Sequence, residues 1–152
     1  VALGPLIDDD AVAKIERHVA DATAKGAKLL AGGKRLGDRF YEPTVLDHVR
    51  PGMRAHEEEL FGPVAVVMRA RDEDEAVRIA NSTIYGLAGG VQSADVERAK
   101  VVARRMRTGQ VDINGGAFNP TAPFGGYRQS GNGRERGEWG IDGYLETKSI
   151  QL

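Results

Sequence analysis

The chain has 152 residues, enough for one domain that buries roughly 68 to 70 % of its unfolded surface, so a single compact unit is the default expectation. Its 21 Lys and Arg and 22 Asp and Glu are interspersed, which leaves no basic face for nucleic acid and no acidic tail. No apolar run approaches the roughly 18 residues of a membrane-spanning helix, and the first residues lack the basic-then-apolar order of a signal peptide, so we expect no membrane partner and a cytoplasmic location. The absence of Cys excludes disulfides, thiolate metal sites and cysteine nucleophiles within these residues.

The first predicted element is a helix that begins after the acidic residues 8–10 and runs to Ala24. A short carboxylate there accepts from free backbone N–H groups, and its charge suits the positive end of the helix dipole. Apolar residues recur at helical spacing, and Gly26 ends the pattern. Two short strands are predicted next, Lys28–Ala31 and Tyr41–Leu46, the second with Pro43 at an edge or irregular start. We expect both strands to cover the flank of a sheet.

From Val64 the pattern alternates between strand and helix. The expected strands are Val64–Met68, Leu87–Val91 and Gly109–Asn114, and the expected helices begin at Asp72 and Asp95. Val64–Met68 is continuously apolar, as in a parallel strand buried on both faces, and Asp72 with Glu75 has the spacing of a capping box. Right-handed crossovers then give a parallel sheet of βαβαβ order, so the predicted fold class is α/β.

Residues 115–143 contain nine of the chain's 20 glycines and are expected to form a long loop with a short helix. A flexible linker is one interpretation, but linkers rarely carry the aromatic residues found here, which favour an ordered wall or lid around a site. Leu145–Leu152 alternates like a strand, which must pair within this chain or across a subunit boundary.

Two local patterns resemble functional sites, but we do not interpret them as such. Gly131 and Gly133 suggest a dinucleotide fingerprint, but its third glycine position is Arg136 and the segment is not in a short βαβ unit, so we expect the glycines to serve a turn. The three histidines have no spacing typical of a metal site, so we predict no metal and interpret them as surface or internally satisfied residues.

Several motifs in order resemble the C-terminal part of the aldehyde dehydrogenase superfamily. The principal ones are Glu57-Glu58-Glu59-Leu60-Phe61-Gly62-Pro63-Val64, Pro123-Phe124-Gly125-Gly126-Tyr127 and Ser130-Gly131-Asn132-Gly133-Arg134-Glu135. Gly4-Pro5-Leu6-Ile7, Lys25-Gly26-Ala27, Gly32-Gly33, Glu42-Pro43-Thr44 and Asn81-Ser82-Thr83-Ile84-Tyr85-Gly86-Leu87 extend the resemblance over essentially the whole chain. The resemblance implies a partial catalytic domain over 1–144, with helix and flanking strands (1–63), βαβαβ core (64–114) and pocket loop (115–144), followed by an oligomerisation strand (145–152).

The resemblance also assigns roles to individual residues. Glu59 would accept hydrogen bonds from the nicotinamide ribose hydroxyls of NAD or NADP, with Phe61 near the nicotinamide ring, although Phe61 is otherwise interpreted as core packing. Glu57 and Glu58 are interpreted as a solvated turn.

The remaining implied roles fall on the Gly-rich loop and the last strand. Phe118 and Phe124 would line the aldehyde pocket, where aromatic walls exclude water. Glu135 would stand behind the catalytic base in a proton relay, as a partly buried carboxylate, the alternative being a salt bridge or a helix start. Arg134 would pair with Glu146 and tie the loop to a subunit interface.

In the enzymes of this superfamily a thiolate attacks the aldehyde, hydride passes to NAD(P)+, and water releases the acid. We therefore expect a fragment of an NAD(P)-dependent aldehyde dehydrogenase, a homo-oligomer acting on a small aldehyde, whose nucleophilic Cys and general base precede these residues. The chain starts at Val1 without an initiator Met, for which we favour a fragment over processing or removal of a tag. The chain would be inactive in isolation because it contains no Cys. The alternative is a stand-alone binding or assembly module derived from the same fold.

Overall fold

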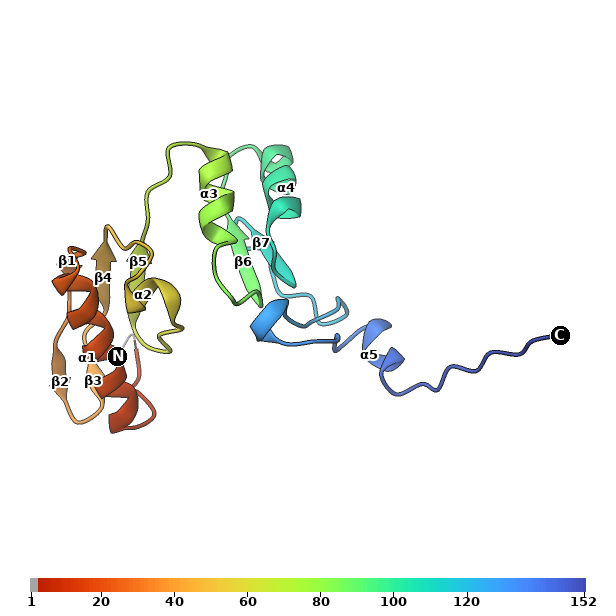
Figure 1. The fold of residues 1–152 in the computed structure, drawn as a ribbon, viewed down its shortest axis with the longest axis horizontal. Helices are drawn as coiled ribbons and strands as arrows, with labels where there is room; N and C mark the ends of the chain where they lie inside the picture. The colour runs from red at the N-terminus through yellow and green to blue at the C-terminus, as the bar shows by residue number, and fades with distance from the viewer. Residues whose placement is uncertain (1–2) are drawn as a thin grey trace. The chain divides into compact units, whose positions relative to one another are not determined.

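The computed structural model describes residues 3–152, which divide into two units after Ala70 (Figure 1). The single compact unit expected from chain length is therefore wrong, and each unit is described by itself. The first comprises α1 (Asp9–Ala24), β1 (Lys28–Ala31), β2 (Arg35–Gly37), β3 (Phe40–Tyr41), β4 (Thr44–Asp47), α2 (Arg54–Glu57) and β5 (Val64–Val67). The second comprises α3 (Glu73–Ala80), β6 (Ala88–Val91), α4 (Val96–Arg105), β7 (Gln110–Ile113), the 3-10 turn η1 (Arg128–Ser130) and α5 (Trp139–Asp142).

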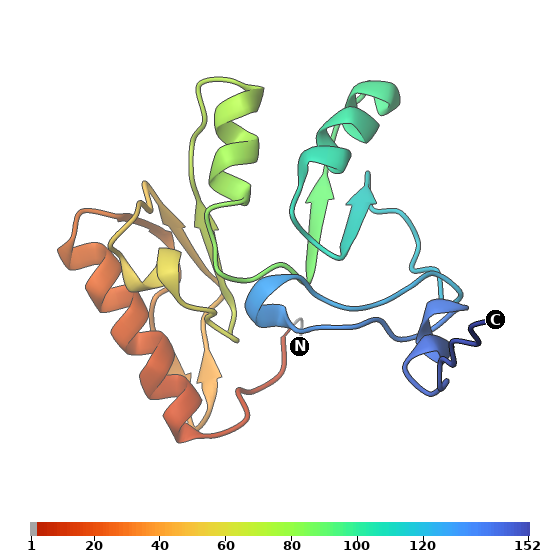
Figure 2. The ribbon, with the colours of Figure 1, turned by 45° about the vertical axis from the view of Figure 1, so that its right-hand side comes forward.

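The core of the first unit lies between α1 and the strands (Figure 2). The predicted helix is confirmed, because the Asp8 carboxylate accepts from the Ala11 N–H at 2.7 Å and the chain turns away at Gly26, where φ is 99°. Its buried face carries Val12, Ile15, His18, Val19 and Ala22. These residues belong to one apolar cluster with Tyr41 and Leu46, apart from His18, which is buried among them as a polar group.

The sheet of the first unit has the order β1-β4-β5, with β1 antiparallel and β5 parallel to β4. The predicted strand Tyr41–Leu46 is instead divided into β3 and β4 around Glu42 and Pro43. Proline has no N–H to donate to a ladder, and β3 pairs with β2 in a separate small hairpin. The division lets Thr44 enter the main sheet as the first residue of β4.

In the second unit, β6 and β7 are parallel neighbours joined through α4, as the alternating pattern predicts. Both predicted helix starts are confirmed, since Asp72 accepts from the Glu75 N–H and Asp95 accepts from the Arg98 N–H. The mixed α/β class is confirmed, but the continuous βαβαβ sheet is not, because β5 pairs with β4 in the other unit.

The Gly-rich segment after β7 is tied into the second unit by backbone hydrogen bonds. The Tyr127 N–H donates to Gly86 O at 2.8 Å, the Gly86 N–H donates to Ser130 Oγ at 3.0 Å, and Phe124 pairs with Glu135 in an antiparallel bridge. These contacts favour the ordered wall over the flexible linker. Residues 145–152 form neither a helix nor a strand pairing within the described residues 3–152, so their role as an intersubunit strand stays a prediction.

Within residues 3–152, no helix has the length and apolar character needed to cross a membrane.

Candidate functional site

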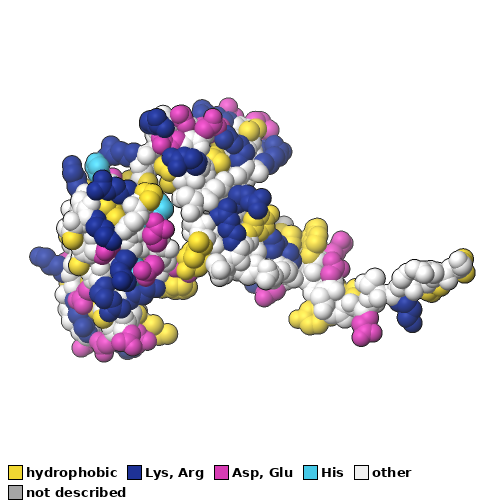
Figure 3. All heavy atoms as spheres, in the orientation of Figure 1, with side chains coloured by type: hydrophobic (Ala, Val, Ile, Leu, Met, Phe, Trp, Pro, Cys, Tyr) yellow, Lys and Arg dark blue, Asp and Glu magenta, His cyan; other side chains and the backbone are white. Residues whose placement is uncertain are grey.

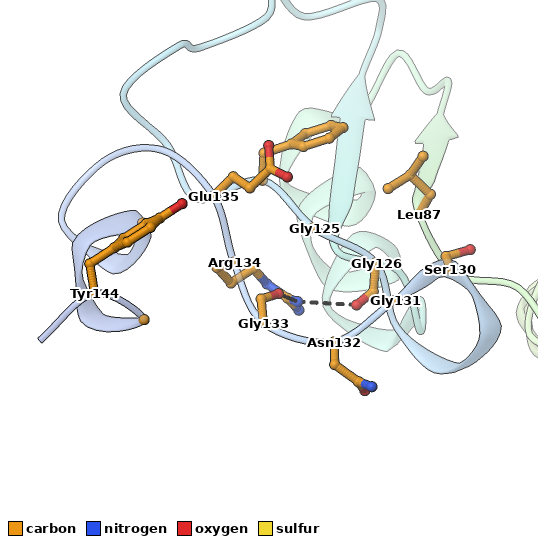
Figure 4. Close-up of a pocket in the computed structure, with 13 residues that line it drawn as sticks. Leu87, Gly125, Gly126, Ser130, Gly131, Asn132, Gly133, Arg134, Glu135 and Tyr144 are labelled. Carbon is orange, nitrogen blue, oxygen red and sulfur yellow. Dashed lines mark hydrogen bonds between the residues drawn. The ribbon is translucent and has the colours of Figure 1, made fainter. Parts of the chain in front are cut away.

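The second unit contains a pocket of about 570 Å³ built by the Gly-rich segment (Figure 4). Its lining comprises Leu87, Phe124, Gly125, Gly126, Ser130, Gly131, Asn132, Gly133, Arg134, Glu135, Gly140, Gly143 and Tyr144. Figure 4 shows Glu135 and Tyr144 on one side of the pocket and Leu87 and Ser130 on the other. Of the predicted site residues, Phe124 and Glu135 line this concave surface and Phe118 does not, so the aldehyde-pocket assignment stays a prediction.

Glycines allow the backbone to close around this pocket. Gly131 and Gly133 have φ values of 124° and 76°, as expected for turn glycines. A Cβ on Gly109, which immediately precedes β7, would lie 1.7 Å from Gly125 O, so only glycine permits the loop to pack there. The close approach fixes the loop against the sheet and so fixes the residues that flank Gly125.

Three residues assigned separately by the family resemblance lie together. Phe124 and Glu135 exchange backbone hydrogen bonds of 2.8 and 2.6 Å, and the rings of Phe118 and Phe124 meet edge to face with centroids 6.3 Å apart. The two rings form a continuous aromatic wall, with the Glu135 backbone at its edge. Glu135 itself is exposed in this chain, so the partial burial expected of it is not observed.

Arg136 completes this cluster, and the sequence analysis missed its role. Its guanidinium carbon lies 4.7 Å from the Phe118 ring centroid and 5.4 Å from that of Phe124, within cation–π range. The only sequence signal was an arginine in the same loop as two aromatic residues.

Arg134 is held by backbone groups of its own loop. Its Nη1 donates to Gly126 O at 3.1 Å, drawn as the dashed line in Figure 4, and to Gly133 O at 2.6 Å, and the guanidinium lies 5.1 Å from the Tyr127 ring centroid. The ion pairs within residues 3–152 do not include the expected pair with Glu146, which lies in the unpaired segment 145–152. That pair stays a prediction for an assembled enzyme.

The two residues assigned to the cofactor lie in the first unit, on the segment between α2 and β5. Phe61 is 78 % exposed and its φ is 50°, so the core-packing interpretation of Phe61 is wrong. Glu59 is exposed, and the Lys14 ammonium donates to its backbone carbonyl at 2.5 Å, which leaves the carboxylate free of that contact. α1 thus anchors the backbone of the segment while both side chains face solvent.

Glu57 and Glu58 are exposed, as the solvated-turn interpretation predicts, but both carboxylates also have polar partners, which for Glu58 include the Arg54 guanidinium at 3.4 Å. Glu57 accepts from the Gly52 N–H at 2.9 Å, and this hydrogen bond lowers the pKa of the Glu57 carboxyl. Glu58 Oε2 lies 3.1 Å from Nε2 of the buried His18, an approach without hydrogen-bond geometry, while His18 Nδ1 is 2.7 Å from Lys14 O.

The charged side chains form mixed rather than single-sign surfaces, as Figure 3 shows on its visible face. Across α3 and α4, Arg98 and Arg105 pair with Glu73, and Arg105 also pairs with Asp74. Among residues 3–152, no group of three or more His, Asp or Glu side chains is arranged to hold a metal ion.

Comparison with known proteins identifies relatives along the whole chain. The model of the aldehyde dehydrogenase family matches residues 1–150. A 3-sulfolactaldehyde dehydrogenase of Pseudomonas putida is 48 % identical over 155 aligned residues, covering 100 % of this chain and 32 % of that protein. The mitochondrial succinate-semialdehyde dehydrogenase of Arabidopsis thaliana is 49 % identical, covering 98 % of this chain and 29 % of that protein.

Solved structures give the same result. An aldehyde dehydrogenase of Mycobacterium tuberculosis, solved in complex with NAD+, matches with a TM-score of 0.92 at 39 % identity, over 99 % of this chain and 32 % of that one. A succinate-semialdehyde dehydrogenase of Burkholderia pseudomallei matches with a TM-score of 0.86 at 52 % identity, over 93 % of this chain and 30 % of that one. The chain therefore spans about a third of the length of the relatives it matches.

Proposed function

Because this chain belongs to the aldehyde dehydrogenase family, we propose that it supplies the C-terminal part of the catalytic domain of an NAD(P)-dependent enzyme that oxidises an aldehyde to a carboxylic acid. The observation that carries the proposal is the cluster of Phe118, Phe124 and Glu135, which the resemblance assigns to aldehyde pocket and proton relay and which meet in one loop. The chain contains no Cys, so the nucleophile comes from residues outside it.

Glu59 and Phe61 fit a nicotinamide nucleotide. A carboxylate that faces solvent can accept from both hydroxyls of a ribose, and an exposed ring offers an apolar face to a planar heterocycle. NAD(P)+, when bound, supplies the hydride acceptor. The residues of this chain would hold its ribose and shield its ring, while Lys14 fixes the Glu59 backbone through its carbonyl.

Phe118 and Phe124 would form the apolar wall of the aldehyde pocket. Rings packed edge to face exclude water from the reacting carbonyl, which strengthens the electrostatic interactions that stabilise developing charge. Glu135 would then hold and pass on a proton of the hydrolytic water through its carboxylate. Its exposure in this chain means that its burial depends on groups from elsewhere in the enzyme.

Two relatives suggest the first substrates to test. The Pseudomonas putida and Arabidopsis thaliana proteins are named for 3-sulfolactaldehyde and succinate semialdehyde, both aldehydes that carry a second, acidic group. We propose a small acidic aldehyde for this protein as well. A homo-oligomer held partly by Arg134, Glu146 and the strand 145–152, in the cytoplasm, completes the proposal.

The isolated chain is expected to have no dehydrogenase activity. Purified 152-residue protein, mixed with a panel of aldehydes and NAD+ or NADP+, should give no increase in absorbance from reduced cofactor, because no thiol is present to form a covalent intermediate. Turnover by this protein would contradict the proposal.

A chimera provides the positive test. The chain replaces the matching third of the Arabidopsis thaliana succinate-semialdehyde dehydrogenase, to which it is 49 % identical. We expect an active enzyme in which Glu135→Gln lowers the steady-state rate by about 10²-fold but keeps the first burst of reduced cofactor, since only the later water-dependent step needs the proton relay. A folded chimera that binds cofactor but never turns over would support the alternative, a non-catalytic binding or assembly module, which the comparisons do not favour.

A further inference from the structure

Arg136 places an available positive charge on the aromatic wall. Its guanidinium lies over the rings of both Phe118 and Phe124, yet within residues 3–152 it forms neither an ion pair nor a hydrogen bond. Arg134, its near neighbour, differs because its guanidinium is already bonded to Gly126 O and Gly133 O. Arg136 is therefore the guanidinium of this loop that keeps its donors for a ligand.

The backbone holds Arg136 in this place. Arg136 and Gly137 both have positive φ values, 65° and 57°, which turn the chain sharply after Glu135. A Cβ on Gly137 would lie 2.3 Å from Thr121 O, so the turn packs directly on the loop between the two phenylalanines. The close approach of the Gly137 and Thr121 backbones therefore places Arg136 beside the two rings.

A guanidinium over an aromatic ring can still donate through its planar edge. Its N–H groups match the two oxygens of a carboxylate in a bidentate, charge-assisted pairing, and the exposure of Arg136 in this chain leaves them accessible. The carboxylates nearest in sequence are Glu135, whose backbone is paired with Phe124, and Glu138, and neither forms an ion pair with Arg136. An anionic ligand on the wall would meet little competition from the protein.

We propose that Arg136 is a specificity-determining residue that binds a carboxylate at the end of the substrate remote from the aldehyde group. The proposal rests on the function proposed above, in which Phe118 and Phe124 line the aldehyde pocket. In this role Arg136 selects aldehydes with a terminal carboxylate over neutral aldehydes of equal length. The competing role, in which Arg136 merely supports the two rings, predicts equal effects on both kinds of substrate.

The test compares 4-oxobutanoate with butanal, which has the same number of carbon atoms and no carboxylate, in the chimeric enzyme. Arg136→Gln should lower kcat/KM for 4-oxobutanoate about tenfold more than it lowers kcat/KM for butanal, a change in the ratio that corresponds to about 1.4 kcal/mol. Arg136→Lys keeps the charge and should retain part of the preference. Arg104→Gln, an equal loss of charge at an exposed site on α4, should change neither value.

Equal losses for both substrates in Arg136→Gln would overturn the proposal while leaving the dehydrogenase function intact. A chimera inactive toward every aldehyde would instead contradict the proposed function. In that case, ligand binding to the isolated 152-residue chain tests Arg136. The single Trp of the chain, Trp139, lies next to Gly137 and can therefore report a ligand bound near Arg136. Butanoate should change Trp139 fluorescence at lower concentration than butanamide, a difference that Arg136→Gln should abolish; equal responses, or none, would refute the site.

Discussion

Phe61 is an aromatic residue whose position is not explained by packing within its own unit. Its ring is 78 % exposed and its backbone adopts a φ of 50°, which is unusual for a residue with a bulky side chain. A position of this kind is maintained by its surroundings, here the anchoring of the neighbouring Glu59 carbonyl by Lys14. An exposed, positioned ring favours contact with a ligand or another part of the enzyme.

Phe61→Ala should therefore separate function from stability. We expect a change within about 0.5 kcal/mol in the free energy of unfolding, because little buried apolar surface is lost. Leu46→Ala, in the core of the same unit, should cost about 2 to 5 kcal/mol because Leu46 is fully buried. Urea unfolding followed by circular dichroism measures both variants.

In the chimera, Phe61→Ala should raise the KM for NAD+ or NADP+ about threefold to tenfold through loss of one aromatic contact. A large stability loss in Phe61→Ala would show that the ring packs in a way that its exposure does not indicate.

Roles for Glu59, Phe124 and Glu135 were predicted because short motifs that resemble the family place each residue at a fixed position, and Phe118 was predicted from the resemblance of its loop. Arg136 was not, because its partners lie 18 and 12 positions away and meet it only after Gly137 has turned the backbone onto Thr121. Contacts of this kind depend on tertiary approach distances, which no local pattern contains.

At the level of elements, the start of α3 follows the predicted capping box in one hydrogen bond and departs from it in the other. Asp72 caps Glu75, as the capping-box spacing predicts, but the Glu75 side chain accepts from the N–H and guanidinium of Arg71 rather than from the Asp72 N–H. Arg78 adds a further ion pair from the next turn. These interactions lower the pKa of the Glu75 carboxyl to about 2, mainly through the Arg71 side chain.

The start of α3 gives a pH-dependent prediction. Since the folded pKa of Glu75 is about 2 and its ordinary value is 4.5, its stabilisation is fully present above pH 4.5 and is lost as the pH falls toward 2. Glu75→Gln should therefore be less stable than the parent chain at pH 7, and the difference should shrink through that window. Urea unfolding followed by Trp139 fluorescence provides the measurement.

Two further variants calibrate this result. Asp72→Ala should cost about 1 kcal/mol at pH 7 through loss of the N-cap. Glu138→Gln removes a carboxylate that forms no ion pair within residues 3–152 and is the matched control for loss of one acidic side chain. A Glu75→Gln difference that stays constant from pH 5 to 2 would contradict the assigned role of the Arg71 pair.

The elements that sequence reasoning located well are those with caps and breakers close by in the chain. Asp8, Asp72 and Asp95 mark helix starts through bonds to residues three positions on, so a short window contains the whole signal. Strand partners are different, because β5 could pair with any later parallel strand on pattern alone and instead pairs with β4. Pairing is set by tertiary competition among strands.

At the level of the whole molecule, the segment 145–152 presents apolar side chains that stay exposed among the residues the structure describes. Ile150 is 82 % exposed, and Leu145 and Leu152 are also exposed, while the backbone groups of residues 146–152 form no hydrogen bond within residues 3–152. An extended segment of alternating side chains can satisfy these groups by adding to a sheet edge of another subunit. We therefore expect the protein to self-associate through it.

Ser149→Pro tests whether this association depends on strand pairing or only on apolar surface. Proline removes one N–H and cannot donate to a ladder, yet it leaves Leu145, Ile150 and Leu152 in place, so pairing should weaken while apolar area persists. Sedimentation velocity should show a shift toward monomer for Ser149→Pro and no shift for the matched Ser149→Ala. Deletion of residues 145–152 should give the same monomer if pairing is the cause.

Two outcomes would contradict this prediction. If self-association survives Ser149→Pro but not the deletion, the association depends on hydrophobic contact alone. If the parent chain is already monomeric, the segment is not an assembly element of the isolated protein.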